Sequence, residues 1–168
     1  CVAVCCVGVS IVQGSSMEDT LSDGDRIVIS YISKASVGDI VVVNANEAVT
    51  MDDDGSLKES AGLSRVIVKR VIAVGGQSVD IDFDRGSVCV DGVMLDEEYV
   101  TKGLTHMDEG AFTGQYPITV PEGYVFVMGD NRNESKDSRS ADIGFVSVDN
   151  IRGVAVLRIY PLDSIGGV

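Results

Sequence analysis

Short apolar runs separated by polar turn residues recur along almost the whole chain. They are rich in valine and isoleucine and end at glycine, aspartate, asparagine or serine, a pattern typical of β-strands. Helical periodicity is weak throughout. We expect strands at residues 26–30, 39–43, 66–74, 78–83, 87–90, 124–128 and 154–160. The pattern predicts an all-β protein whose antiparallel sheets form a barrel or a sandwich.

Two polar stretches interrupt this rhythm. Residues 44–60 include three consecutive aspartates and are expected to form a hairpin tip or a loop. Residues 97–115 contain few β-forming side chains. We therefore predict a β core made of residues 1–75 and 123–168, with a smaller second β lobe inserted at residues 76–122.

The first twelve residues, CVAVCCVGVSIV, are almost entirely apolar. They are fewer than the roughly 20 residues that a helix needs to cross a bilayer. Their valine and isoleucine content favours a strand. The segment is either the remnant of a membrane anchor or a buried first strand, and we expect an anchor upstream of residue 1.

Composition narrows the function classes. The 168 residues carry a net charge of -13, and an acidic surface without a basic cluster argues against binding nucleic acid. The four cysteines show no metal-ligand spacing, so no structural metal is expected. They are expected to be small buried apolar residues, and a disulfide stays open. His106, the one histidine, lies in a polar loop, which makes a Ser-His-Asp triad a poor fit.

Three segments carry candidate chemistry. Ser16 follows the first apolar run in the stretch GSSMEDTL, which alone is also typical of an ordinary turn. Lys69 and Arg70 interrupt the apolar run VIVKRVIAV, and alternation sends them to opposite faces of a strand. Lys69 is either a protective lysine on an edge strand or a buried amine of lowered pKa that can accept a proton. Residues 129–139 follow a strand, where Asp137 and Arg139 are well placed to pair.

In this order the three segments resemble the type I signal peptidase family. Its motifs are Ser-Met-x-Pro-Thr-Leu, then Lys-Arg-Val within a strand, then Gly-Asp-Asn-Arg-x-x-Ser-x-Asp-Ser-Arg. The last motif is matched at every defined position by residues 129–139. The similarity extends from about residue 12 to residue 160, which is most of the chain.

The resemblance implies a role for each matched residue. Ser16 would be the nucleophile, and its backbone N–H would be one oxyanion donor. Lys69 would be the general base and later the acid for the leaving amine. Ser135 would hydrogen-bond the lysine amine and orient it. Asp137 and Arg139 would form a supporting ion pair behind that serine.

The resemblance also implies that Met17 lines the substrate cleft. Three positions depart from the family pattern. The proline of the serine motif is replaced by Asp19, which can form an Asx-type turn instead. Gly14 stands where some members carry a serine that supplies a second oxyanion donor. The Gly-x-Pro-Gly-Asp after the lysine strand reads AVGGQ at residues 73–77, so the hinge into the second lobe differs.

The resemblance implies a membrane-bound serine endopeptidase that removes N-terminal signal peptides from secretory precursors after small-x-small sites. It would be a monomer without cofactor or metal, in contact with membrane lipid, with its catalytic domain on the extracytoplasmic side. Two alternatives remain: a self-cleaving repressor-type Ser-Lys protease, and a catalytically inactive paralogue or binding module on the same fold. A separation between Ser16 Oγ and Lys69 Nζ far beyond hydrogen-bond reach would favour the inactive paralogue.

Overall fold

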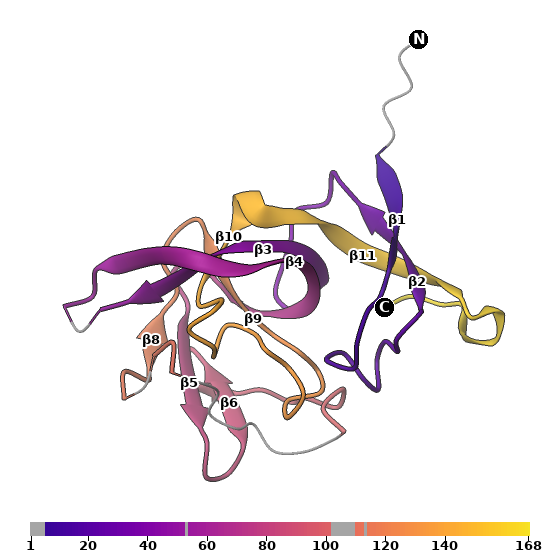
Figure 1. The fold of residues 1–168 in the computed structure, drawn as a ribbon. Helices are drawn as coiled ribbons and strands as arrows, with labels where there is room; N and C mark the ends of the chain where they lie inside the picture. The colour runs from indigo at the N-terminus through magenta and orange to yellow at the C-terminus, as the bar shows by residue number, and fades with distance from the viewer. Residues whose placement is uncertain (1–5, 53, 102–109, 113) are drawn as a thin grey trace.

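The structure, a computed structural model, describes residues 6–52, 54–101, 110–112 and 114–168. Two antiparallel sheets contain its strands (Figure 1). The larger sheet contains, in spatial order, β1 (Val7–Ile11), β2 (Arg26–Ser30), β11 (Ile151–Tyr160), β3 (Ile40–Met51), β4 (Leu57–Val74), β9 (Tyr124–Met128) and β10 (Val146–Ser147). The smaller sheet contains β7 (Val93–Met94), β6 (Ser87–Val90), β5 (Ser78–Asp82) and β8 (Ile118–Thr119).

The predicted all-β, antiparallel fold is confirmed, and neither sheet closes into a barrel. The only helical elements in the described residues are the short 3-10 turns η1 (Val148–Asn150) and η2 (Leu162–Ser164). No helix in this part of the chain combines the length and the apolar character needed to cross a bilayer.

The polar segment at residues 44–60 contains the tip of a hairpin, as one of the two alternatives predicted, but most of the segment is strand rather than loop. β3 and β4 pair from Ile40 opposite Arg70 out to Met51 opposite Leu57, and only the tip between them is a turn. They form the long hairpin arm of Figure 1. The outer half of β4 is largely exposed, so its strand can carry polar side chains on both faces. The alternation of apolar and polar residues that marks a half-buried strand is therefore absent there.

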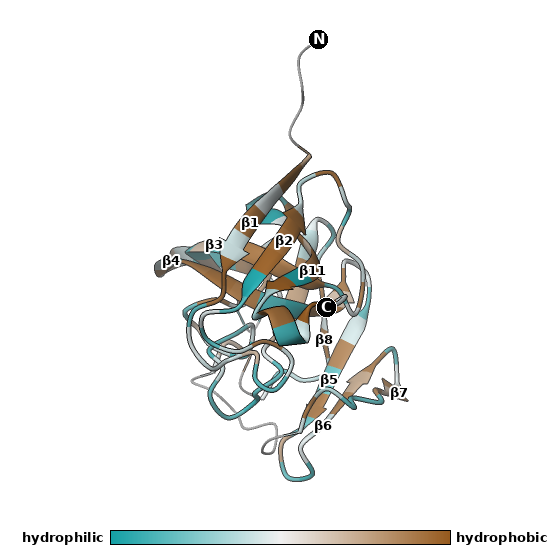
Figure 2. Ribbon diagram, turned by 90° about the vertical axis from the view of Figure 1, so that its right-hand side faces the viewer, coloured by the Kyte–Doolittle hydropathy of each residue, from teal (hydrophilic) through white to brown (hydrophobic). Residues whose placement is uncertain are grey.

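The strand predicted within the first twelve residues is present as β1, but its expected burial was wrong. β1 lies at the edge of the larger sheet and pairs only with β2. Val7, Val9 and Ile11 alternate along β1 and are about half exposed. Figure 2 shows the apolar character of β1 beside the apolar strands of the same sheet. An edge strand covered on one face leaves its other face to solvent.

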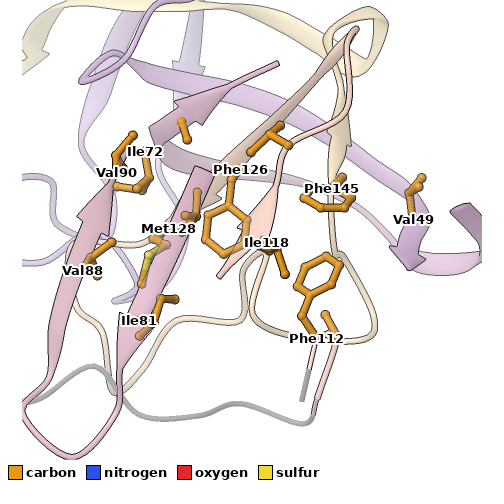
Figure 3. Packing of buried hydrophobic residues seen from close by; sticks show 14 residues of the cluster. Val49, Ile72, Ile81, Val88, Val90, Phe112, Ile118, Phe126, Met128 and Phe145 are labelled. Carbon is orange, nitrogen blue, oxygen red and sulfur yellow. The ribbon is translucent and has the colours of Figure 1, made fainter. Parts of the chain in front are cut away.

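One hydrophobic cluster joins the two sheets (Figure 3). Ile81 and Val88 of the smaller sheet pack with Phe126 of β9 in this cluster. Phe112 closes it against Phe145, with ring centroids 4.5 Å apart. Because the smaller sheet shares this cluster with the larger one, the two sheets are held together by one core. The division into a core and an inserted lobe at residues 76–122 stays a prediction.

Candidate active site

Ser16 lies in the turn that follows β1, and two buried side chains anchor this turn. Met17 and Leu21 are 1% and 0% exposed and belong to one hydrophobic cluster with strands of the larger sheet. The Leu21 N–H donates to the Met17 carbonyl at 2.8 Å. The Gly14 N–H donates to the Asp23 carboxylate at 2.7 Å. These contacts hold Ser16 half-buried between two anchored ends. We call residues 14–21 the nucleophile turn, after the role expected of Ser16.

Lys69 reaches Ser16 from β4. Its Nζ lies 2.6 Å from Ser16 Oγ and 2.9 Å from the carbonyl oxygen of Val68. The lysine is only 3% exposed. Burial lowers the pKa of Lys69 from 10.5 to about 8, and the nearby carboxylate of Asp137 partly opposes this shift. A substantial fraction of the amine is therefore neutral near pH 8, where it can accept a proton from the serine.

The segment after β9 forms the floor beneath this pair. Asp137 is fully buried and accepts two hydrogen bonds from the Arg139 guanidinium, each 2.8 Å long. It also accepts the Gly129 N–H at 2.9 Å. Although burial raises the pKa of Asp137, the Arg139 charge and these hydrogen bonds lower it below its ordinary value. The predicted ion pair between Asp137 and Arg139 is thus present, and it fixes the chain at Gly129.

A family model described as "Signal peptidase, peptidase S26" matches residues 1–160. The chain belongs to this signal peptidase family. By its similarity to members of that family, the chain is a serine endopeptidase. It is 36% identical over 162 residues to "Probable signal peptidase I-1" of Synechocystis sp., a match that covers 92% of this chain and 72% of the relative.

Two further proteins are similar. "Signal peptidase I P" of Bacillus subtilis subsp. natto is 35% identical over 162 residues, covering 92% of this chain and 78% of the relative. Among solved structures, a signal peptidase I from Enterococcus faecalis matches with a TM-score of 0.51 and 27% sequence identity. That match covers 73% of this chain and 97% of the solved chain.

Ser135 is near the expected place but does not make the expected hydrogen bond. Its hydroxyl is buried and makes no hydrogen bond to Lys69, whereas it lies close enough to the Asp137 carboxylate to help lower the pKa of that carboxyl. The hydroxyl lies over Gly129, where an added Cβ would come within 2.2 Å of Ser135 Oγ and 2.4 Å of the Ser16 carbonyl oxygen. Glycine at position 129 therefore lets the turn that carries Ser16 and the segment that carries Ser135 approach each other in this signal peptidase site.

Met17 does not line the cleft, so that expectation was wrong. Its side chain points into the hydrophobic cluster, because the turn that presents Ser16 to solvent directs the next residue inward. Asp19, at the family's proline position, is exposed and accepts a hydrogen bond from the Thr101 hydroxyl.

A groove of about 450 Å³ runs past Ser16 and Lys69. One wall comes from β1 and the nucleophile turn, and the other follows residues 65–69 of β4. β9 pairs with β4 only from Arg70 onward, so the edge of β4 before Arg70 has no paired strand among the described residues. The Val71 N–H donates a hydrogen bond to the carbonyl of Asp39, which directly precedes β3, at 2.9 Å. By antiparallel alternation, the backbone groups of Val66 and Val68 face the open edge.

Sequence reasoning missed the partners of Arg70. Its guanidinium binds both oxygens of Asp130, at 2.9 and 2.6 Å, and Asp130 accepts the Thr20 hydroxyl at 2.6 Å. The available signal was the alternation that sends Arg70 to the face opposite Lys69. No group of three metal-ligating side chains occurs in the part of the chain that the structure describes. His106 lies outside the described residues.

Proposed function

We propose that this chain cleaves N-terminal signal peptides from secretory precursors by means of a Ser16-Lys69 dyad. The observation that carries the proposal is the 2.6 Å contact between the Ser16 hydroxyl and a buried amine of lowered pKa. A serine hydroxyl is a weak nucleophile until an adjacent base takes its proton. The contact favours a catalytic role over an inactive module on the same fold.

Each proton has a defined path in this reaction. Neutral Lys69 accepts the Ser16 proton as Oγ bonds to the scissile carbonyl carbon, and the Ser16 N–H donates to the developing oxyanion. The lysine ammonium then protonates the leaving amine as the C–N bond breaks, which leaves an ester on Ser16. Lys69 next deprotonates a water that attacks this ester, and its proton returns to Ser16 Oγ as the peptide leaves.

Ser135, Asp137 and Arg139 would support the base. The Asp137-Arg139 pair fixes the segment that carries Ser135, and rotation of the buried Ser135 hydroxyl would direct it toward the Lys69 amine. The Asp137 charge also keeps the lysine pKa from falling further. We therefore assign these three residues to positioning and electrostatic support.

The open edge of β4 suits an extended substrate. A peptide that adds beside β4 would pair with the backbone groups of Val66 and Val68, which face the groove. Side chains two residues apart in an extended peptide point the same way. A groove wall next to the dyad would therefore restrict two alternate positions at once, which gives a small-x-small preference before the cut bond.

We also place the site at a membrane surface on the extracytoplasmic side, with the chain as a monomer that needs no cofactor. Val7, Val9 and Ile11 present an exposed apolar face on β1 beside the groove. Apolar surface of this kind favours an interface with lipid. The test is co-flotation with phospholipid vesicles, which replacement of Val9 by Asp should weaken.

The test of the dyad is cleavage of a labelled precursor. Ser16→Ala and Lys69→Ala should each abolish cleavage and leave the fold intact by circular dichroism. Lys58→Ala is the matched control, because Lys58 is an exposed lysine on the same strand. Wild-type cleavage by Ser16→Ala or Lys69→Ala would refute the proposed dyad.

A further inference from the structure

The irregular segment at residues 97–101, which follows β7, lies against the nucleophile turn and against two arginines that flank the dyad. We call residues 97–101 the strap. It belongs to neither of the motifs that hold Ser16 and Lys69, and no role follows from the chemistry described so far. Three of its side chains contact three separate elements of the site.

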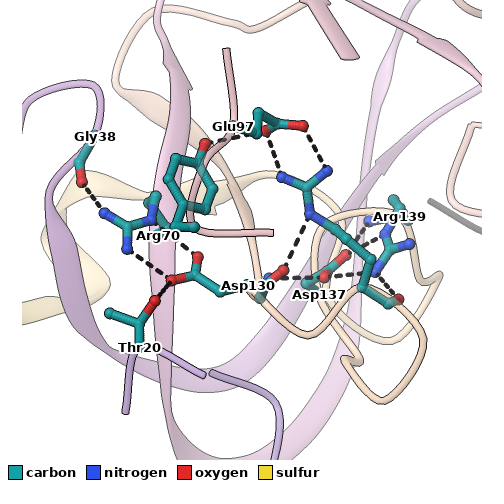
Figure 4. Close-up of polar contacts among 10 residues, drawn as sticks. Thr20, Gly38, Arg70, Glu97, Asp130, Asp137 and Arg139 are labelled. Atoms are coloured by element: carbon teal, nitrogen blue, oxygen red, sulfur yellow. Dashed lines mark hydrogen bonds and ion pairs between the residues drawn. The ribbon is translucent and has the colours of Figure 1, made fainter. Parts of the chain in front are cut away.

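Tyr99 acts on the turn through Arg70. The Arg70 guanidinium carbon lies 4.1 Å from the centre of the Tyr99 ring, in a cation–π stack. The same guanidinium is paired with Asp130, and these side chains are 11% and 1% exposed. Asp130 in turn holds Thr20, four residues after the nucleophile. Figure 4 shows this chain of contacts from Arg70 through Asp130 to Thr20. The stack with Tyr99 thus orients the Arg70 guanidinium. Arg70 binds Asp130, and Asp130 holds Thr20 at the far end of the turn.

Glu97 acts through Arg132. Its carboxylate binds both terminal nitrogens of the Arg132 guanidinium, which is almost completely buried. The Arg132 Nε donates to the Gly129 carbonyl at 3.1 Å. Gly129 packs directly on the Ser16 carbonyl. The Tyr99 hydroxyl donates to Glu97 at 3.0 Å, so the two chains of contacts start from one unit.

Thr101 contacts the turn directly, because its hydroxyl donates to the Asp19 carboxylate. Proline restricts the backbone dihedral φ by its ring, and aspartate has no ring to do so. The side-chain bond to Thr101 ties position 19 to the strap, which offsets part of the lost restriction.

From these contacts we infer that the strap positions the nucleophile turn during catalysis, with Tyr99 as its principal positioning residue. The inference rests on the proposed function, since it names further residues for the same reaction. The strap touches neither reacting atom. Loosening it should lower the rate of the chemical step and leave substrate binding along β4 largely unchanged.

Steady-state cleavage of a fluorogenic precursor peptide tests this. Tyr99→Leu removes the ring face and should lower kcat about tenfold, which is about 1.4 kcal/mol and typical of a cation–π stack of this burial. KM should stay within about twofold. Tyr99→Phe keeps the ring and should retain most of kcat. Tyr160→Leu is the matched control, because it removes an arginine–tyrosine stack between β2 and β11, and it should leave kcat unchanged.

Unchanged kcat in folded Tyr99→Leu overturns the inference, and so does an equal loss in Tyr99→Phe. Should Tyr99→Leu fail to fold by circular dichroism, Thr101→Val decides. Thr101 is exposed, and its replacement should lower kcat by about threefold, whereas a wild-type value overturns the inference. The proposed function fails separately, if Ser16→Ala still cleaves the peptide.

Discussion

Replacing Lys69 by methionine measures the free energy that the protein spends on burying the amine. The pKa of Lys69 is about 8 in the folded chain, below its ordinary value of 10.5. The folded state therefore binds fewer protons than the unfolded state between these two values, and stability rises with pH across this window. Below about pH 8 the full cost of burial is present. Methionine has a similar length and no charge, so it removes that cost.

The magnitude follows from the shift. At about 1.4 kcal/mol per pKa unit, lowering the pKa from 10.5 to about 8 costs the wild type roughly 3 kcal/mol at pH 7. The variant also loses the hydrogen bonds to Ser16 and Val68, which are worth about 1 kcal/mol each. Lys69→Met should therefore be more stable than the wild type by about 1 kcal/mol at pH 7. At pH 10 the burial cost falls below about 1 kcal/mol, and the wild type should become the more stable protein.

Urea denaturation of both proteins at pH 7 and at pH 10 provides the assay. The difference in unfolding free energy between them should change by about 2.5 kcal/mol across this range. The hydrogen-bond losses cancel in that change, so it reports the pKa shift alone. Lys58→Met, on the exposed part of β4, should show no such change. A difference that stays constant with pH would refute the buried, partly neutral amine.

Three further outcomes follow from the site. The kcat/KM of precursor cleavage should rise with pH and reach half its plateau near the Lys69 pKa of about 8; a profile that is flat through this region would contradict lysine as the base. Asp137→Ala strands a buried guanidinium and should lower the free energy of unfolding by about 3–5 kcal/mol in a denaturant titration. Gly129→Ala forces a Cβ to within 2.4 Å of the Ser16 carbonyl and should cut kcat roughly 100-fold. Gly167→Ala, whose Cβ would meet nothing within 4 Å, should leave kcat unchanged.

The sequence predicted the fold class and the elements that carry the site, because both depend on local patterns. Period-two alternation placed Lys69 and Arg70 on opposite faces of a strand, and the structure has them there. Of the two interpretations of Lys69, the structure supports the buried amine, because Lys69 is 3% exposed even though the edge of β4 is unpaired before Arg70. Local pattern thus placed Lys69 on a strand, whereas the pairing of Ser16 with Lys69 was expected only from the family resemblance.

The sequence did not predict which way the side chains in turns point. Met17 was expected in the cleft and instead lies in the core, because packing against the larger sheet decides which way a turn residue points. The Ser135 hydroxyl depends on a rotamer that no spacing encodes. Tyr99 meets Arg70 only through the tertiary fold, and the polar stretch that contains Tyr99 has no periodicity from which this contact could be read.

The open edge of β4 that suits an extended substrate also exposes the protein to unwanted association. Exposed backbone donors and acceptors will pair with any extended chain, including the same edge of another copy. Like charges counter such self-association: at -13 per molecule, two copies repel each other over about a Debye length. Concentrated salt would shorten that range to a few ångströms, so the purified protein should be more prone to aggregate in high salt than at low ionic strength.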